Sequence, residues 1–162
     1  MTDIDVIKTL VTKLGNQLKK REWKIVAAES CTGGGLSYWI TSVPGSSDWF
    51  ERGLITYSNT AKEELLGVNP ETLNQFGAVS EQTVREMAEG ALQHSQAQIS
   101  VAITGIAGPD GGTRDKPVGT VWIACAGIQF ATQANVYIFS GDRQQIREQS
   151  IIEALTKIMQ NT

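Results

Sequence analysis

The chain has 162 residues, of which 41% are hydrophobic and 19% are charged, and it carries a net charge of −3. This length provides enough buried surface for one domain with its own core, and the composition is that of a folded protein, so we expect a single domain over residues 1–162. The acidic balance excludes nucleic acid as the main partner, because binding to phosphates needs an excess of Lys and Arg.

The first part of the chain alternates helices with short apolar strands. Apolar residues in the stretch Ile4–Leu18 recur at spacings of three and four, which indicates the buried stripe of a helix. The pair Pro44–Gly45 ends a second helix, and Ser58 or Asn59 can cap a third. In chain order, we expect a helix at 3–20, a strand at 24–28, a helix at 36–43, a strand at 53–57 and a helix at 60–67.

The second part of the chain contains most of the predicted strands. Ser80 can cap a long helix, and Asp142 with Gln145 has the pattern of a capping box at the start of the last one. Gly127 separates two β-rich runs, which predicts an antiparallel pair. In chain order, we expect a short helix at 71–75, a helix after Ser80, strands at 99–104, 119–126 and 131–139, and a final helix after Asp142.

This order of elements predicts the fold class. Helices that alternate with strands are typical of an α/β domain, in which parallel strands form a sheet with helices on both faces. We therefore predict a three-layer α/β/α single domain with a mixed parallel and antiparallel sheet, whose antiparallel pair lies at one side. In such sheets ligands bind at the carboxyl ends of the strands, so the loops that follow the parallel strands form the candidate site.

Few residues are available for metal or imidazole chemistry. Cys31 and Cys125 lie far apart, no CxxC or HxxxH spacing is present, and the single histidine, His94, lies near the end of a predicted helix. We interpret His94 as a solvated residue, which argues against a Ser-His-Asp or Cys-His site. Neither of the usual nucleotide-binding motifs, GxxxxGK[ST] and GxGxxG, occurs, so the main sequence support for binding of ATP or a dinucleotide is missing. We expect no metal and no cofactor.

The sequence also lacks the patterns of a membrane protein. The longest apolar stretch, Val118–Ile128, has about half the length of a membrane span. The first residues are acidic and do not form the basic segment of a secretory signal. We therefore expect a cytoplasmic protein with no membrane partner.

Two glycine-rich loops follow predicted strands. The loop Glu29–Gly35 opens a helix with three small hydroxyl or thiol residues and three glycines, so its backbone N–H groups suit a phosphate, a carboxylate or an oxyanion. The loop Thr104–Gly112 contains four glycines, which let the backbone approach a ligand closely. The alternatives are a helix cap for the first loop and a flexible crossover for the second.

Lys62 lies where the strand at 53–57 passes into the next helix. A lysine in the first turn of a helix is unusual, because the helix dipole disfavours a cation there. A solvated lysine is the common alternative. A right-handed crossover between two adjacent parallel strands would bring Lys62 and the first glycine loop to the same edge of the sheet.

Several long motifs of the chain resemble a known family. The motifs are AESCTGG at 28–34, GSSDWFERGLITYSNTAK at 45–62, GAVSEQTV at 77–84, ITGIAGPDGGT with KPVGTVW at 103–122, and FSGDR at 139–143. Together they resemble the CinA C-terminal domain family and, within it, the stand-alone bacterial nicotinamide-nucleotide amidases of the PncC type. The resemblance covers nearly the whole chain and is specific, because the motifs are long and occur in the right order.

The resemblance implies hydrolysis of the carboxamide of nicotinamide mononucleotide to nicotinic acid mononucleotide and ammonia, in pyridine-nucleotide salvage. Matched to the family motifs, Ser30 corresponds to the nucleophile, and Lys62 with Tyr57 to the groups that handle the proton. The family also implies a homodimer, while Trp49 and Phe50 can pack either in the core or against a second subunit. We assign substrate binding to residues of the two glycine loops and of FSGDR, namely Thr32, Gly33, Gly34, Thr104, Gly105, Gly108 and Arg143.

The chemical requirements of amide hydrolysis agree with the roles given to these residues. The amide carbon must be attacked by an activated nucleophile, its oxyanion held and its nitrogen protonated on departure. Because His94 is poorly placed and the sequence offers no set of metal ligands, a serine activated by a lysine is the main mechanism that remains. It requires that the pKa of Lys62 fall from about 10.4 by roughly 3 units. Cys31 is the rival nucleophile, but its side chain should point away from a site that Ser30 faces.

Some roles remain open at this stage. The backbone amides of the glycine loops are the expected oxyanion donors, and which loop holds the oxyanion and which the phosphate is undecided. Arg143 is suited to bind the phosphate group of the substrate, and the alternative is that it forms an ion pair on the surface. Glu29 either faces the positive pyridinium ring or anchors its loop.

Two other functions compete with the amidase. One is a non-catalytic nucleotide-sensing module that keeps the glycine loops for binding only. The other is a metal-dependent amidohydrolase built on carboxylates. Ammonia release from nicotinamide mononucleotide in EDTA separates the three, because the sensor releases none and the metal enzyme loses its activity.

Overall fold

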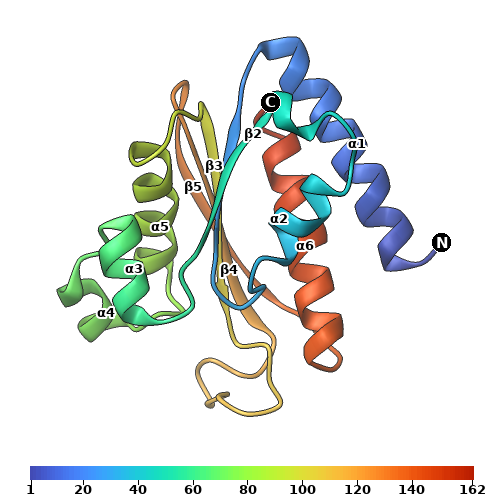
Figure 1. Cartoon of the computed structure of the whole chain (residues 1–162). Coiled ribbons are helices and arrows are strands. Elements are labelled where there is room, and N and C mark those ends of the chain that lie inside the picture. The colour runs from blue at the N-terminus through green and yellow to red at the C-terminus, as the bar shows by residue number, and fades with distance from the viewer.

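The computed structural model describes residues 1–162, in which one five-stranded sheet lies between two layers of helices (Figure 1). All the predicted helices and strands are present. In chain order the elements are α1 (Asp3–Arg21), β1 (Ile25–Glu29), α2 (Gly35–Thr41), a 3-10 helix (Ser46–Asp48), β2 (Phe50–Ile55), α3 (Asn59–Leu66), α4 (Pro70–Phe76), α5 (Glu81–Gln93), β3 (Ile99–Gly105), β4 (Thr120–Gly127), β5 (Phe130–Ile138) and α6 (Arg143–Met159).

The strand order of the sheet is β2-β1-β3-β4-β5. β1 pairs in parallel with both β2 and β3, whereas β4 pairs antiparallel with β3 and β5. This is the predicted mixed sheet, with its antiparallel pair at one side. Because β1, β2 and β3 run in the same direction, the loops that follow them lie at one edge of the sheet.

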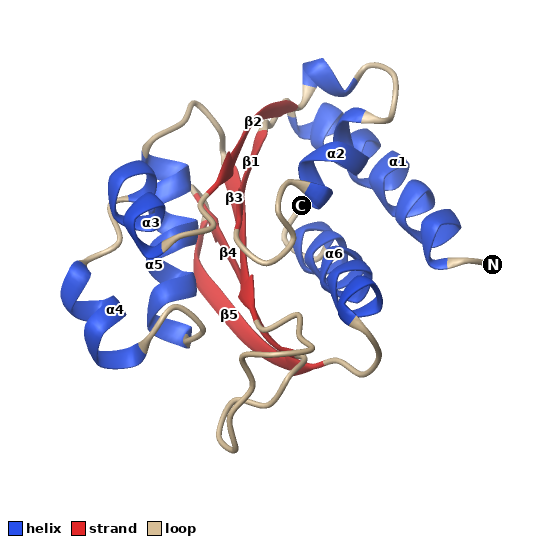
Figure 2. Ribbon diagram, turned by 60° about the horizontal axis from the view of Figure 1, so that its bottom comes forward, coloured by secondary structure: helices blue, strands red, loops and turns tan.

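Helices cover both faces of the sheet, as Figure 2 shows most clearly, with α3, α4 and α5 on one face and α1, α2 and α6 on the other. Each face has its own core, a cluster of 23 buried residues under α1, α2 and α6 and one of 13 under α3, α4 and α5. Successive residues of β1 alternate between them: Ile25 and Ala27 belong to the larger core, and Val26 and Ala28 to the smaller. β1, an interior strand buried on both faces, therefore has a strict period of two.

Helix ends occur at the predicted capping residues. Ser58 begins α3, and its hydroxyl accepts a hydrogen bond from the Ala61 N–H at 3.0 Å. Asp142 and Gln145 form the predicted capping box at the start of α6. These caps satisfy backbone N–H groups that have no partner inside a helix, and so they fix where α3 and α6 start.

β2 begins at Phe50, three residues before the predicted strand. It is an edge strand with half-buried and exposed residues, so it lacks the apolar run by which β1 and β3 are predicted. The question left open for Trp49 and Phe50 is resolved in favour of the core: Trp49 is 1% exposed, and Phe50 packs against the same cluster. No helix has the length and hydrophobicity needed to cross a membrane.

Candidate active site

A cavity of about 310 Å³ lies at the edge of the sheet where the parallel strands end. It brings together seven predicted site residues, which come from the loop after β1, the end of β3 and the loop that follows it, the β2–α3 connection, α3 and the start of α6: Ser30, Tyr57, Lys62, Thr104, Gly105, Gly108 and Arg143. The rest of its wall is formed by Cys31, Ala78, Val79, Ile106, Ala107, Asp110 and Gly111. Residues far apart in the sequence therefore share one site, as the topology predicts.

Ser30 and Lys62 are in direct contact in this cavity. The Lys62 Nζ lies 3.0 Å from the Ser30 Oγ, and the Lys62 side chain is 1% exposed. The same Nζ donates to the backbone carbonyls of Thr56 at 2.8 Å and Tyr57 at 3.3 Å. The adjacent parallel strands β1 and β2 thus bring the predicted pair together.

Local sequence explains why these two side chains meet. Ser30 directly follows β1 and continues its alternation on the side of Val26 and Ala28, the face that α3 covers. Lys62 shares the inner face of α3 with Leu66, one turn further on, and both are buried. Lys62 therefore occupies a position where an apolar residue is usual, four residues before a leucine of the core.

The surroundings of Lys62 favour its neutral form. Burial lowers the pKa of Lys62 to about 8, against an ordinary 10.5. When the amine is neutral, its two N–H groups can donate to the Thr56 and Tyr57 carbonyls, and its lone pair then faces the Ser30 hydroxyl. In this geometry the amine can accept the proton of the Ser30 hydroxyl, the step that activates a serine nucleophile.

Cys31 lacks the features of a nucleophile. It borders the cavity, but its side chain packs in the larger core, on the opposite face of the sheet from Lys62. Burial raises the pKa of the Cys31 thiol to about 12, so the reactive thiolate is disfavoured. The expected orientation away from Lys62 agrees with the alternation along β1.

The loop after β3 forms one wall of the cavity. At the end of β3, the Thr104 hydroxyl donates to the Ala78 carbonyl at 2.9 Å, which fixes the segment before α5 against the strand from which this loop leaves. Gly108 has a φ of 78°, a left-handed conformation that favours glycine, and a Cβ there would collide with the Val118 side chain. The backbone N–H groups of Ala107 and Gly108 donate to no group in the protein. Both residues line the cavity.

Arg143 connects two parts of the rim. It is the first residue of α6, and its guanidinium donates to the Gly108 carbonyl at 2.7 Å and to the Tyr57 hydroxyl at 3.3 Å. Arg143 is otherwise exposed, so it presents a positive charge at the cavity mouth. The Tyr57 hydroxyl makes no hydrogen bond to Ser30 or Lys62 and meets Lys62 only through its backbone carbonyl.

Thr32, Gly33 and Gly34 do not line the cavity, and their role in substrate binding stays a prediction. The Thr32 hydroxyl donates instead to the Glu29 carboxylate. That carboxylate also accepts from the first N–H groups of α2, which are therefore not free for a phosphate. Of the two roles considered for Glu29, the structure supports the loop anchor, since the side chain is fully buried and absent from the cavity wall.

The wall also contains residues that the sequence analysis did not name. Ala78 and Val79 come from the GAVSEQTV motif, directly before the Ser80 cap of α5. The GAVSEQTV motif and the helix cap that follows it are the sequence signals for this segment. Asp110, the one acidic residue of the wall, lies in the glycine-rich loop that was predicted to approach a ligand.

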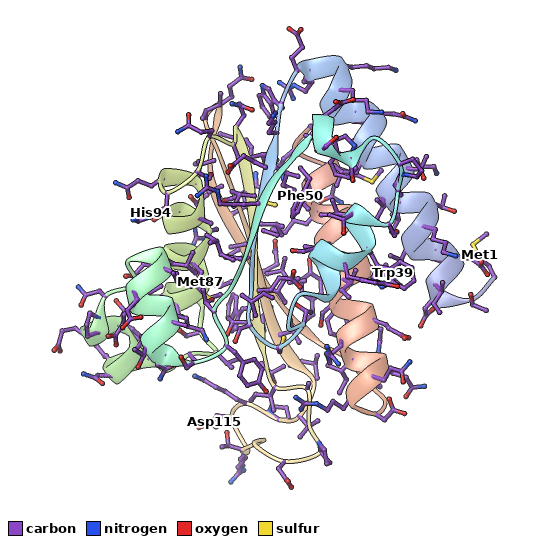
Figure 3. The ribbon with its side chains drawn as sticks, in the orientation of Figure 1. Met1, Trp39, Phe50, Met87, His94 and Asp115 are labelled. Atoms are coloured by element: carbon purple, nitrogen blue, oxygen red, sulfur yellow. The ribbon has the colours of Figure 1, made fainter.

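The side chains of His, Cys, Asp and Glu form no group of three that could hold a metal ion. His94 follows the last turn of α5, where its ring nitrogen contacts the Gly90 carbonyl at 2.7 Å. Figure 3 shows His94 at the opposite end of the sheet from Asp115, which belongs to the loop after β3. An imidazole is thus absent from this cavity.

The fold and the site define an α/β domain in which a serine contacts a buried lysine at the carboxyl edge of a mixed sheet. The chain belongs to the CinA C-terminal domain family, which matches residues 7–162. It is 49% identical to the nicotinamide-nucleotide amidohydrolase PncC of Escherichia coli K12, over 99% of this chain and 96% of that protein.

Two further relatives place the chain in the same family. PncC of Enterobacter agglomerans is 51% identical over 90% of this chain and 89% of that protein. Among solved structures, the competence/damage inducible protein CihA from Agrobacterium tumefaciens has a TM-score of 0.95 and 38% identity, covering 100% of this chain and 98% of that one. The fold predicted from the sequence is therefore also that of an experimentally determined relative.

Proposed function

We propose that this chain hydrolyses the carboxamide of nicotinamide mononucleotide to nicotinic acid mononucleotide and ammonia, by a serine–lysine mechanism that serves pyridine-nucleotide salvage. The observation that carries the proposal is the 3.0 Å contact between Lys62 Nζ and Ser30 Oγ in the cavity. Relatives of nearly the same length and about half identical in sequence are nicotinamide-nucleotide amidohydrolases by name.

In the first half of the reaction, Ser30 forms a bond to the amide carbon. Neutral Lys62 takes the hydroxyl proton as the Ser30 oxygen attacks, and the carbonyl oxygen becomes an oxyanion. The Lys62 ammonium then gives its proton to the amide nitrogen, the carbon–nitrogen bond breaks, and ammonia leaves. The product of this half is an ester between Ser30 and the nicotinoyl group of the nucleotide.

In the second half, water replaces ammonia. Lys62, neutral again, takes a proton from water as the water oxygen attacks the ester carbon, and returns it to Ser30 as the ester bond breaks. The net reaction consumes one amide and one water and gives one carboxylic acid and one ammonia. The unpartnered N–H groups of Ala107 and Gly108 are the proposed oxyanion donors, because preorganised donors stabilise the charge that develops in the transition state.

Arg143 supplies the proposed contact with the substrate phosphate. Its guanidinium lies at the rim, held in place by the Gly108 carbonyl and the Tyr57 hydroxyl. A planar guanidinium suits a phosphate because it offers several N–H donors in one plane. We propose that Tyr57 orients Arg143, which differs from the proton-handling role that the family resemblance implies for it.

The direct test is ammonia release from nicotinamide mononucleotide by the purified protein in EDTA. We expect turnover in the wild type and a loss of at least 1,000-fold, on the order of the loss seen when a nucleophile or its base is removed, in Ser30→Ala and Lys62→Met. A protein that binds the nucleotide, as seen in a raised Tm, but releases no ammonia would be the nucleotide-sensing module instead.

The phosphate contact has its own test. Loss of a charge-assisted hydrogen bond should raise the KM for nicotinamide mononucleotide by about tenfold or more in Arg143→Gln. The KM for nicotinamide riboside, which lacks the phosphate, should stay unchanged. Arg114→Gln is the matched control, because Arg114 is exposed and outside the cavity wall. Equal effects of Arg143→Gln on both substrates would contradict the assignment.

A further inference from the structure

The Glu29 carboxylate is completely buried beside the Ser30 loop and is not part of the cavity wall. One oxygen accepts hydrogen bonds from the Thr32 hydroxyl at 2.7 Å and the Leu36 N–H at 2.9 Å. The other accepts from the Ser37 N–H at 3.0 Å and the Ser37 hydroxyl at 2.7 Å. No Lys, Arg or His nitrogen lies within 4.0 Å of it, so these four donors compensate the buried charge.

These bonds close the loop that carries Ser30. Glu29 is the last residue of β1, and its partners lie in the middle of the loop and in the first turn of α2. The loop of five residues from Ser30 to Gly34 is therefore fixed at its start, its middle and its end by one side chain. Within this loop, Gly33 and Gly34 lack side chains, so the second half of the loop has no side-chain packing of its own.

The backbone of Glu29 also reaches the lysine. Its carbonyl accepts a hydrogen bond from the Thr56 N–H at 2.8 Å, and the Thr56 carbonyl accepts from Lys62 Nζ at 2.8 Å. Lys62 Nζ in turn contacts the hydroxyl of Ser30, the residue that follows Glu29. Glu29 thus belongs to a closed ring of contacts through Thr56, Lys62 and Ser30.

We infer that Glu29 is a positioning residue, whose carboxylate holds Ser30 at the distance from Lys62 that proton transfer needs. This rests on the proposed function in taking Ser30 as the nucleophile. Both carboxylate oxygens are required, because two of the four donors are backbone N–H groups that cannot turn away. In Glu29→Gln, the amide NH₂ faces a backbone N–H in either of its two orientations, so one end of the loop is released.

The experiment compares Glu29→Gln with the wild type. We expect kcat for nicotinamide mononucleotide to fall about 100-fold, which is the effect of misplacing reacting groups by about 1 Å. The KM should change less than threefold, because the carboxylate does not touch the wall of the cavity. Glu64→Gln, an exposed carboxylate on the helix that carries Lys62, is the matched control and should behave as wild type.

A second readout does not depend on the substrate. A fluorophosphonate labels a serine whose hydroxyl is activated, so the rate of Ser30 labelling reports the contact with Lys62 directly. We expect labelling of Glu29→Gln to slow by about as much as kcat falls. If the wild type is labelled at Ser30 but does not hydrolyse the nucleotide, the proposed substrate is wrong, and the labelling rates still decide the role of Glu29.

Ser37→Ala provides a variant for the case that Glu29→Gln does not fold. It removes the Ser37 hydroxyl and leaves the other three donors of the carboxylate in place, so a smaller loss of kcat and labelling, about tenfold, is expected. Wild-type kcat and labelling in folded Glu29→Gln, or in Ser37→Ala, would overturn the inference. So would a KM that rises in proportion to the loss of kcat, because that pattern indicates a distorted cavity.

Discussion

Replacing Lys62 by Met tests whether the buried amine is as poorly protonated as its surroundings indicate. Burial lowers the pKa of Lys62 from 10.5 to about 8. Since one pKa unit corresponds to about 1.4 kcal/mol, the protonated lysine costs the folded state about 3 kcal/mol at neutral pH. Met fills a similar volume without a charge, so the variant is free of this cost.

The sign of the effect follows from proton binding in the two states. The cost is fully present below pH 8, where Lys62 is protonated in both the folded and the unfolded chain. Between pH 8 and pH 10.5 the unfolded chain still binds the proton that the folded chain has lost, so the stability of the wild type rises with pH. Lys62→Met does not titrate, so its free energy of unfolding relative to wild type should fall by about 2 to 3 kcal/mol between pH 7 and pH 10.

The assay is urea unfolding of both proteins at pH 7, 8.5 and 10, followed by circular dichroism. The quantity of interest is how the difference in the free energy of unfolding between the two proteins changes with pH. Met cannot make the hydrogen bonds to Thr56 and Tyr57, but a loss that is the same at every pH does not contribute to this change. Lys13→Met is the control, because Lys13 is exposed on α1, and its difference from wild type should stay flat. A flat result for Lys62→Met would show that Lys62 binds its proton normally, and the lysine would then be a poor base.

Three more results are expected. kcat/KM should rise about fivefold between pH 7 and pH 8, because the neutral fraction of Lys62 grows from about a tenth to a half; a flat profile would contradict this. Cys31→Ala should keep its turnover within about threefold while losing about 1 to 2 kcal/mol of stability, and ammonia release with urea unfolding checks both. Gly90→Ala should destabilise the fold by about 3 kcal/mol, because its Cβ would collide with the Leu66 carbonyl. Glu89→Ala, at an exposed position of the same helix, is the control. Equal thermal unfolding of the two variants would disprove the close packing of α3 on α5.

The sequence predicts the elements well where local signals are strong. β1 and β3 are short and mostly apolar, and Ser58, Ser80 and Asp142 mark helix starts with polar side chains that accept hydrogen bonds from backbone N–H groups. The edge strand β2 spans Phe50–Ile55, so the strand predicted at 53–57 starts three residues too late and ends two residues too late, because pairing with β1 and not the apolar run sets its ends. Long-range pairing, which a local pattern does not contain, decides the ends of such strands.

The site is predicted in the same uneven way. Lys62 is accessible to sequence reasoning, since a lysine near the start of a helix is unusual and the crossover topology brings it to the edge of the sheet where Ser30 lies. The contact of Arg143 with Tyr57 depends on how α6 starts beside the β2–α3 connection, which no local pattern contains. Glu29 lies next to Ser30 in the sequence, yet whether it faces the ligand or the interior is decided only by the donors that α2 provides.

The choice of Ser30 over Cys31 as the proposed nucleophile rests on the register of a single strand. Glu29, Ser30 and Cys31 are consecutive, and the period of two along β1 sends the first and third toward α2 and the larger core and the second toward α3. β1 lies between β2 and β3 and is buried on both faces, so both neighbours fix its register. A shift of one residue would direct Cys31 at Lys62 and expose the Glu29 charge to the smaller apolar core. Which side chain contacts Lys62 is therefore set by the same packing that makes the fold stable.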